Sequence, residues 1–210
     1  MVRVYINRCD GKLATWIMQA IDQIIERCLE GDQQSYEILY RQFVDGIYRL
    51  CYSILLNRHD AEDVTQETYV YAFRNLSRYD PQRAGFKTWL YTIAISRCRN
   101  LYRRKRPALM DFAQLLQLPV SGPKSETPES ALVERDVQSA VEQALARLSP
   151  RLREAVVLRY GHGLMYREMA EIMHCPQKTA ESRVRLAHDA LRGLLQADGP
   201  GLLEELLSSS

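Results

Sequence analysis

Apolar residues recur at three- and four-residue spacings along most of this 210-residue chain, which is the period of an α-helix that buries one face. The pattern runs from Ile21 to Leu56 and resumes on both sides of a proline-rich stretch. No segment alternates apolar and polar side chains as a half-buried strand does, and no unit of about 20–50 residues repeats. The sequence therefore predicts an all-α protein, with two small helical domains joined by a flexible linker.

Helix-start and helix-stop signals divide this pattern into segments. Gly31 ends a first helix, and Asp32 is expected to be the N-cap of the second. Asp60 is expected to cap the third helix, after a connector at 57–59. Prolines at 107, 119, 123 and 128 mark a linker. The predicted organisation is an N-terminal extension at 1–20, a domain at 21–106, a linker at 107–134, a second domain at 135–196 and a tail at 197–210.

Composition argues against several classes of protein. The five cysteines are odd in number and form no CxxC pair, which favours reduced thiols over disulfides or a zinc site. The chain has no run of about 18 apolar residues and no apolar stretch typical of a signal peptide, so we expect neither membrane insertion nor export. The four histidines show no HExxH spacing, and there is no GxxxxGK loop. We therefore expect a cytoplasmic protein that is not an enzyme and binds no metal or cofactor.

The net charge of +2 hides an uneven distribution. Residues 1–106 carry 17 basic and 12 acidic side chains, residues 107–134 carry 1 and 4, and residues 135–210 carry 10 of each. Six of the ten residues from 97 to 106 are basic and none is acidic. A basic surplus concentrated in the first part of the chain indicates a nucleic-acid surface there.

That basic cluster ends a helix expected from about Gly85 to Arg104. Basic side chains neutralise phosphates, and aromatic rings offer stacking surfaces to unpaired bases. Phe86 and Trp89 are therefore either core residues or stacking surfaces, and the arginines are either a solvated helix end or phosphate contacts.

Residues 166–185 have the pattern of a short helix, a tight turn and a second helix. Met169 and Met173 give the first helix an apolar face, and His174 stands where the turn needs a left-handed backbone. The second helix is expected to pack back through Ala180, Val184 and Ala187. This pattern predicts a helix-turn-helix whose second helix enters the major groove of DNA, although an ordinary helical hairpin has the same spacing. Polar residues on the second helix favour DNA: Lys178, Thr179, Ser182, Arg183 and Arg185.

Residues 60–73 predict a helix with two different faces. One stripe is apolar or small and is expected in the core: Ala61, Thr65, Thr68, Tyr69, Ala72 and Leu76. The opposite stripe surrounds one apolar side chain with charged and amide groups: Asp63, Gln66, Glu67, Val70 and Arg74. Such a face is either solvated or contacts a partner.

Taken in order, these segments resemble one family closely. DAEDVTQETYVYAF is followed by FKTWLYTIAISRCRN, the proline-rich linker and LSPRLREAVVLRYGHGLMYREMAEIMHCPQKTAESRV. From about Ile21 to Leu195 the chain is similar to bacterial sigma-70 family factors of the extracytoplasmic-function group. The resemblance implies a two-domain initiation factor that binds core RNA polymerase and directs it to promoter DNA. Such factors often have an inhibitory anti-sigma factor as a further partner.

The resemblance also assigns site residues. Core polymerase would be bound by the third helix, through Asp60, Glu62, Asp63, Gln66, Glu67 and Val70. The −10 promoter element would be read and melted by the loop at 79–85 and the following helix, through Tyr79, Lys87, Trp89, Ser96, Arg97, Arg99, Asn100, Arg103 and Arg104. The −35 element would be read by the helix-turn-helix, through Lys178, Thr179, Glu181, Ser182, Arg183 and Arg185. The acidic linker would run toward the RNA exit path.

The chain departs from the family pattern at several of these positions. Ser96 stands where asparagine is common, Lys178 where glycine is usual, and Glu181 where a basic residue is usual. Leu186 and His188 also stand where arginines are common. Glu181 disfavours phosphate but can accept a hydrogen bond from cytosine N4. Together with the balanced charge of residues 135–210, these departures predict weak −35 binding.

Two other functions remain open on the sequence. A stand-alone helix-turn-helix regulator would bind DNA without polymerase, but it leaves the pattern at 60–104 without a role. A helical adaptor that binds only protein would use the basic helix against an acidic partner. Association with core polymerase distinguishes the regulator from a sigma factor, and salt-dependent DNA binding tests the adaptor.

Overall fold

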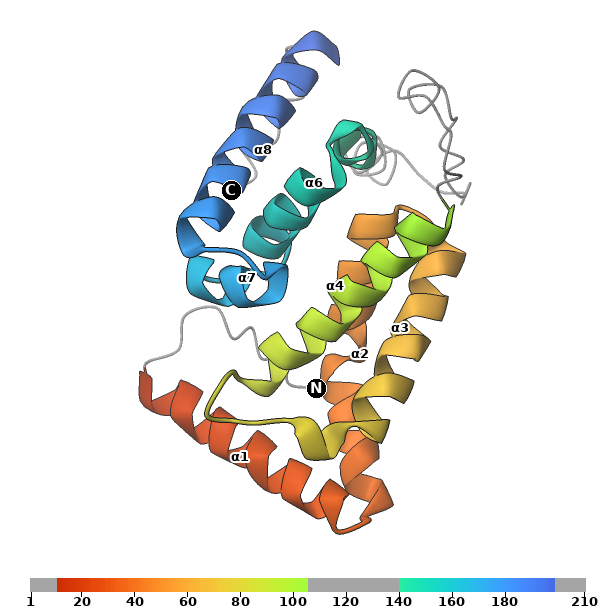
Figure 1. Cartoon of the computed structure of the whole chain (residues 1–210), viewed down its shortest axis with the longest axis vertical. Helices are drawn as coiled ribbons and strands as arrows, with labels where there is room; N and C mark the ends of the chain where they lie inside the picture. The colour runs from red at the N-terminus through yellow and green to blue at the C-terminus, as the bar shows by residue number, and fades with distance from the viewer. Residues whose placement is uncertain (1–10, 106–139, 199–210) are drawn as a thin grey trace, which may run out of the picture.

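The computed structural model describes residues 11–105 and 140–198, and every regular element in these ranges is a helix (Figure 1). The N-terminal half contains α1 (Gly11–Leu29), α2 (Gln33–Leu55), α3 (Arg58–Arg74), a 3₁₀ turn η1 (Leu76–Arg78) and α4 (Phe86–Lys105). The C-terminal half contains helical residues at 140–147, then α6 (Pro150–Val156), a π-helical turn η3 (Val157–Gly161), α7 (Tyr166–Met173) and α8 (Gln177–Asp198). The all-α prediction is confirmed. The expected linker at 107–134 and most of the expected tail lie outside the described residues.

Side-chain caps define the starts of α2 and α3. Asp32 caps α2 as predicted, since its carboxylate accepts hydrogen bonds from the Gln34 backbone N–H at 3.1 Å and the Ser35 hydroxyl at 2.7 Å. At α3 the prediction was wrong, because the N-cap is Asn57, whose Oδ1 accepts from the Asp60 backbone N–H at 3.0 Å. The helix therefore begins inside the expected connector, and Asp60 lies in its first turn.

α1 is longer than the sequence pattern predicted. It begins at Gly11, whereas a helical start near Ile21 was expected, so part of the expected extension belongs to this helix. Ile25 and Cys28 are buried where α1 packs on α2. Among the described residues, no helix combines the length and apolar character needed to cross a bilayer.

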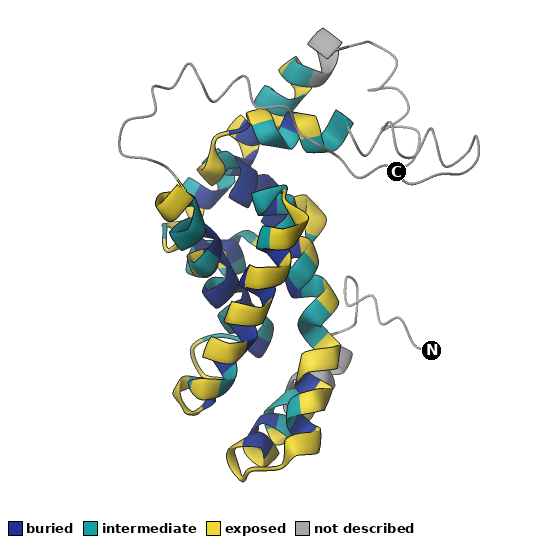
Figure 2. Cartoon of the chain, turned by 90° about the vertical axis from the view of Figure 1, so that its right-hand side faces the viewer, coloured by how far each residue is buried: buried dark blue, intermediate teal, exposed yellow. Residues whose placement is uncertain are grey.

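One cluster of buried apolar residues fills the space between α2, α3 and α4 and continues into α6, α7 and α8 (Figure 2). The stripe predicted for the core is buried at all six positions, five of them on α3 and the last in η1: Ala61, Thr65, Thr68, Tyr69, Ala72 and Leu76. The hydroxyls of Thr65 and Thr68 each donate to a backbone carbonyl four residues earlier, at 2.7 Å, so both are satisfied inside the core. α3 is thus held by its inner face, which leaves the opposite face free.

The C-terminal half contains the predicted helix-turn-helix. His174 ends α7 with φ of 51°, the left-handed conformation that the sequence led us to expect in the turn. Ala180 and Ala187 of α8 are fully buried and Val184 nearly so, and α8 packs against both α6 and α7. The same half also packs against the N-terminal half, since α7 lies along α4, and η3 and α6 touch α2.

Candidate functional site

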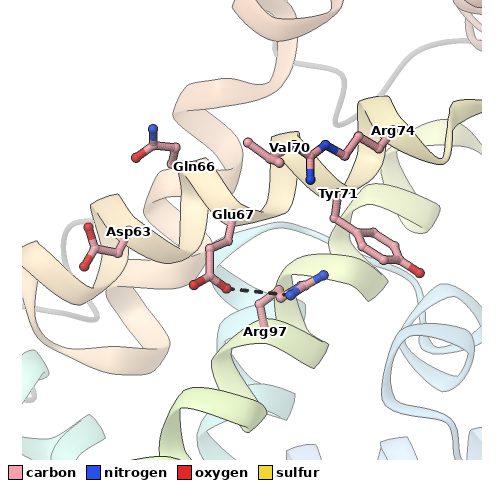
Figure 3. Close-up of a pocket in the computed structure, with 7 residues that line it drawn as sticks. All are labelled: Asp63, Gln66, Glu67, Val70, Tyr71, Arg74 and Arg97. Carbon is pink, nitrogen blue, oxygen red and sulfur yellow. Dashed lines mark ion pairs between the residues drawn. The ribbon is translucent and has the colours of Figure 1, made fainter.

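The outer face of α3 forms a surface groove of about 440 Å³. Figure 3 shows the residues that line it: Asp63, Gln66, Glu67, Val70, Tyr71, Arg74 and Arg97. Val70 and Tyr71 are 45% and 38% exposed, which places apolar surface in the middle of a polar rim. Apolar side chains surrounded by polar groups are a common arrangement at protein-binding surfaces. Four of the six predicted polymerase contacts lie here.

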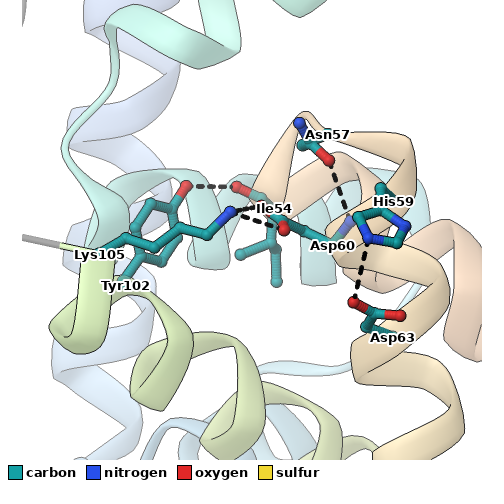
Figure 4. A network of polar contacts seen from close by, with 7 residues as sticks. All are labelled: Ile54, Asn57, His59, Asp60, Asp63, Tyr102 and Lys105. Carbon is teal, nitrogen blue, oxygen red and sulfur yellow. Dashed lines mark hydrogen bonds and ion pairs between the residues drawn. The ribbon is translucent and has the colours of Figure 1, made fainter.

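The other two predicted polymerase contacts, Asp60 and Glu62, lie outside this groove. Both carboxylate oxygens of Asp60 accept from Lys105 Nζ at 2.6 Å (Figure 4). Glu62 accepts from Arg58 Nε at 2.9 Å on the same helix. The Asp60 pair joins the start of α3 to the end of α4, so its role in this structure is to hold the two helices together.

Arg97 was expected among the −10 contacts, and the structure places it at the groove instead. Its Nη1 lies 3.7 Å from Glu67 Oε2, and its guanidinium carbon lies 4.7 Å from the centre of the Tyr71 ring. Arg97 is therefore grouped with the predicted polymerase contacts of α3.

Aromatic rings fix the loop that precedes α4. The Tyr79 ring lies 5.4 Å from Phe86 and 5.6 Å from Trp89, between centroids. The Tyr79 hydroxyl donates to Asp22 Oδ1 at 3.4 Å, and burial together with the Asp22 charge raises the pKa of Tyr79 to about 12. Phe86 is buried and Trp89 is partly buried, so Trp89 supports the core and keeps some accessible surface.

The remaining −10 candidates lie on two different faces of α4. Ser96, Arg103 and Arg104 are exposed, and the partly buried Asn100 accepts a hydrogen bond from Arg103. This outward face is open to a nucleic acid. Lys87 lies on another face, 5.4 Å from the centre of the Tyr91 ring. Burial lowers the pKa of Lys87, with an opposing effect from Glu168 of α7.

Arg99 points away from the outward face, toward the C-terminal helices. Its Nε and Nη2 donate to Glu154 Oε1 and Oε2 at 2.9 Å and 2.6 Å, which makes a two-bond ion pair. Glu154 belongs to α6 and is only 2% exposed. Glu154 was not predicted, because a single glutamate in a short helix carries no signal for a partner 55 positions away.

The start of α8 presents the predicted −35 contacts. Lys178 and Arg185 are exposed, and the other four are partly buried: Thr179, Glu181, Ser182 and Arg183. The structure adds Gln177 to these candidates, since it is the first residue of α8 and donates from its side-chain amide to Glu181 Oε1 at 3.0 Å. Its exposed amide at the helix start was the available signal, since glutamine is a common reader of adenine.

In the described part of the chain, no three His, Cys, Asp or Glu side chains are grouped to hold a metal ion. The four cysteines described there are free thiols: Cys28, Cys51, Cys98 and Cys175.

Two family models match the chain. The Sigma-70 region 2 model matches residues 39–108, and the Sigma-70, region 4 model matches residues 138–191. The ECF RNA polymerase sigma factor SigW of Bacillus subtilis is 32% identical over 187 residues, which cover 84% of this chain and 97% of SigW. The RNA polymerase sigma-H factor of Pseudomonas aeruginosa is 32% identical over 180 residues, which cover 83% of this chain and 93% of that protein.

Two solved structures are also similar to this chain. CnrH, in complex with the cytosolic domain of CnrY, matches with a TM-score of 0.64 at 25% identity, over 84% of this chain and 97% of that chain. The sigma factor RpoE of Bartonella quintana, in complex with the anti-sigma factor NepR, shares the fold with a TM-score of 0.59 at 23% identity, over 79% and 99% of the two chains. The chain belongs to the extracytoplasmic-function group of the sigma-70 family of RNA polymerase sigma factors.

Proposed function

We propose that this sigma factor holds core RNA polymerase through the outer face of α3 while α4 and α8 contact the promoter. A sigma factor directs core polymerase to promoters for transcription initiation, and this chain has both family regions for that task. It does so in the cytoplasm, without catalysing a reaction of its own. Residues 21–106 form the domain for core polymerase and the −10 element, and residues 135–196 form the domain for the −35 element.

The observation that carries the proposal is the groove on α3. Asp63, Gln66 and Glu67 supply charge and hydrogen-bonding groups beside the exposed Val70 and Tyr71. Because the opposite face of the helix is buried at every position of its stripe, the core fixes the α3 backbone that carries these side chains before a partner binds, which lowers the entropy cost of binding.

The proposed DNA contacts follow from exposure and charge. Arg103 and Arg104 extend from the outward face of α4 and match the phosphates of the −10 region, next to Ser96. Lys178 and Arg185 extend from α8, and the first turn of that helix would meet base edges in the major groove of the −35 element.

An anti-sigma factor is a further proposed partner. CnrH was solved with the cytosolic domain of CnrY, and RpoE with the anti-sigma factor NepR. The exposed Val70 and Tyr71 would suit such an inhibitor as well as they suit polymerase, because a shared surface is the direct way to block one partner with another.

Run-off transcription tests the proposal. Purified core polymerase is supplied with genomic fragments, with and without the protein, and discrete transcripts are expected only when the protein is present. A stand-alone regulator would bind DNA but would not co-purify with core polymerase, and an adaptor would show no salt-dependent DNA binding. The absence of both core-dependent transcripts and co-purification would refute the proposal.

A further inference from the structure

The interface between α4 and the C-terminal helices is built from polar contacts on one stripe of α4. Tyr91 Oη lies 3.1 Å from His162 Nδ1, Arg99 forms the two-bond pair with Glu154, and Tyr102 Oη accepts from Arg153 Nη1 at 2.6 Å. Apolar residues fill the space around these contacts, since one buried cluster spans both halves of the chain. The two halves therefore form a packed, closed arrangement.

Arg153 binds both halves of the protein at once. Its guanidinium donates to the carbonyls of Leu145, Ala146 and Leu148 in the C-terminal half, and to the Ile54 carbonyl at the end of α2 at 2.8 Å. With the Tyr102 hydroxyl this makes five acceptors, as many as a guanidinium has N–H groups. Arg153 is 7% exposed, so it would be costly to leave these donors without acceptors.

Glu154 also depends on the closed arrangement. A carboxylate that is 2% exposed is stable in its charged form only when a cation and hydrogen-bond donors face it, and Arg99 provides both. When the two halves separate, Glu154 loses this partner and the Arg99 guanidinium becomes available to another anion.

The closed arrangement is incompatible with simultaneous contact to both promoter elements. Elements centred about 25 base pairs apart lie about 85 Å apart on B-DNA, at about 3.4 Å per base pair. A unit of about 60 residues has a radius of gyration of only about 10 Å, and α7 touches α4 directly. The 34 residues between Lys105 and Ala140 have an extended length of roughly 115 Å, which permits the separation that promoter binding requires.

We propose that the Arg99–Glu154 pair is an intramolecular lock, in which the Glu154 carboxylate occupies the guanidinium that would otherwise bind DNA phosphate. The free protein is then autoinhibited by its own C-terminal half, without any second protein. Opening exchanges one anion for another at Arg99, so DNA and Glu154 compete for the same side chain. This inference rests on the proposed function, which assigns α4 to the −10 region.

Glu154→Gln in the full-length chain tests the lock, because it removes the competing charge at nearly constant volume. Small-angle X-ray scattering should show a larger radius of gyration for this variant. Binding to a fluorescein-labelled, mixed-sequence 15-nucleotide single strand should strengthen about tenfold if opening raises the competent fraction from about one tenth to nearly all. The matched control is Glu171→Gln, which removes a carboxylate that pairs with Arg167 on α7 itself and should leave both measurements unchanged.

Circular dichroism checks that the variant retains its helices. If Glu154→Gln loses helicity, Tyr91→Phe replaces it, because this change removes only the hydroxyl contact to His162 and should produce a smaller opening in the same direction. An unchanged radius of gyration in a folded variant would overturn the lock. An opened chain with unchanged affinity for DNA would overturn the competition for Arg99. Neither measurement involves polymerase, so transcription and co-purification still decide the proposed function separately.

Discussion

The guanidinium of Arg97 lies over the ring of Tyr71, with 4.7 Å between the guanidinium carbon and the ring centre, so a cation from α4 covers an aromatic side chain of α3. A cation–π contact at an exposed site contributes about 0.5–1 kcal/mol. Arg97 also lies 3.7 Å from Glu67, and the groove that they line holds two acidic side chains, Asp63 and Glu67, and two basic ones, Arg74 and Arg97. Charge reversal at both Asp63 and Glu67 would therefore leave every charged side chain of the groove basic.

Asp63→Arg combined with Glu67→Arg should abolish association with core polymerase. Both side chains are exposed, so the fold should persist, while charge reversal at an interface costs several kcal/mol. Co-purification with tagged core enzyme measures the effect. Glu37→Arg on α2 is the control, since Glu37 is also an exposed, paired carboxylate but lies outside the groove. Retention of the double variant at the wild-type level would contradict the assignment of α3.

Arg103→Ala combined with Arg104→Ala should lower open-complex formation and flatten the salt dependence of DNA binding. Each lost phosphate contact reduces the slope of log K against log salt by about 0.9 on duplex DNA and by about 0.7 on single strands. Both side chains are exposed and lie outside the Arg99–Glu154 pair, so they are accessible to phosphates even in the closed chain. Arg41→Ala on α2 serves as the control for loss of one surface charge. Slopes equal to wild type would mean that these arginines do not touch DNA.

Glu181→Ala should strengthen binding to all −35 sequences alike. Gln177 holds one carboxylate oxygen of Glu181 through a 3.0 Å hydrogen bond, and in the proposed complex the negative charge of Glu181 would face the phosphates that edge the major groove. Transcription of a promoter library with the wild-type protein and with Glu181→Ala measures the effect. Gln177→Ala is the companion variant, because it keeps the negative charge of Glu181 but releases the Glu181 side chain from its hydrogen bond. A loss of preference at one base pair, worth about 1–3 kcal/mol, would instead show that Glu181 reads a cytosine.

Acid should open the closed arrangement. Burial, with the positive charges of Lys87 on α4 and Arg49 on α2, lowers the pKa of His162 to about 4. A solvated histidine has a pKa of about 6.5, so the open state binds more protons. The contribution of neutral His162 to closure is complete above about pH 6.5 and is lost as the pH falls toward 4.

At pH 5.5 this linkage shifts the opening equilibrium about tenfold relative to neutral pH. The radius of gyration from X-ray scattering at pH 7.5 and 5.5 measures it. His162→Gln has no titrating ring facing Tyr91 and Lys87, and its radius should therefore respond less to pH. A pH response of equal size in both proteins would assign the effect to other groups.

Tyr69→Phe should raise the free energy of unfolding by about 1 kcal/mol, because the hydroxyl of Tyr69 is buried without a hydrogen-bond partner. Burial also raises the pKa of Tyr69, as expected for a phenol that cannot be solvated when charged. Urea denaturation measures the change. Tyr79→Phe is the contrasting variant, since it removes a hydroxyl that donates to Asp22 and should lower stability. A Tyr69→Phe variant that is less stable than the wild type would disprove the claim that the buried hydroxyl destabilises the fold.

Features that depend on local periodicity were predictable from the sequence. The two faces of α3 were both predicted, because a 3.6-residue repeat decides which side chains share a side of a helix. The left-handed turn at His174 was also predicted, and so was the packing of α8 through Ala180, Val184 and Ala187, because both depend on residue type and spacing within one short segment.

Features that depend on distant partners were not predictable. Arg153 contacts Ile54, which is 99 positions away, and Glu154 contacts Arg99, which is 55 positions away. Neither contact produces a periodic pattern in the sequence. The prediction of the α3 N-cap was wrong for a different reason. Asparagine and aspartate are about equally good N-caps, so the sequence alone did not choose between Asn57 and Asp60.

The packing of α4 constrains how this gene can diverge. α2 and α3 cover one part of the helix and α7 another, which leaves Ser96, Asn100, Arg103 and Arg104 facing outward. A substitution at a covered position disturbs folding, whereas one at these four positions alters only what the helix presents to a ligand. Descendants that acquire new target genes have few such positions on α4, so most of that innovation should accumulate in the first turns of α8.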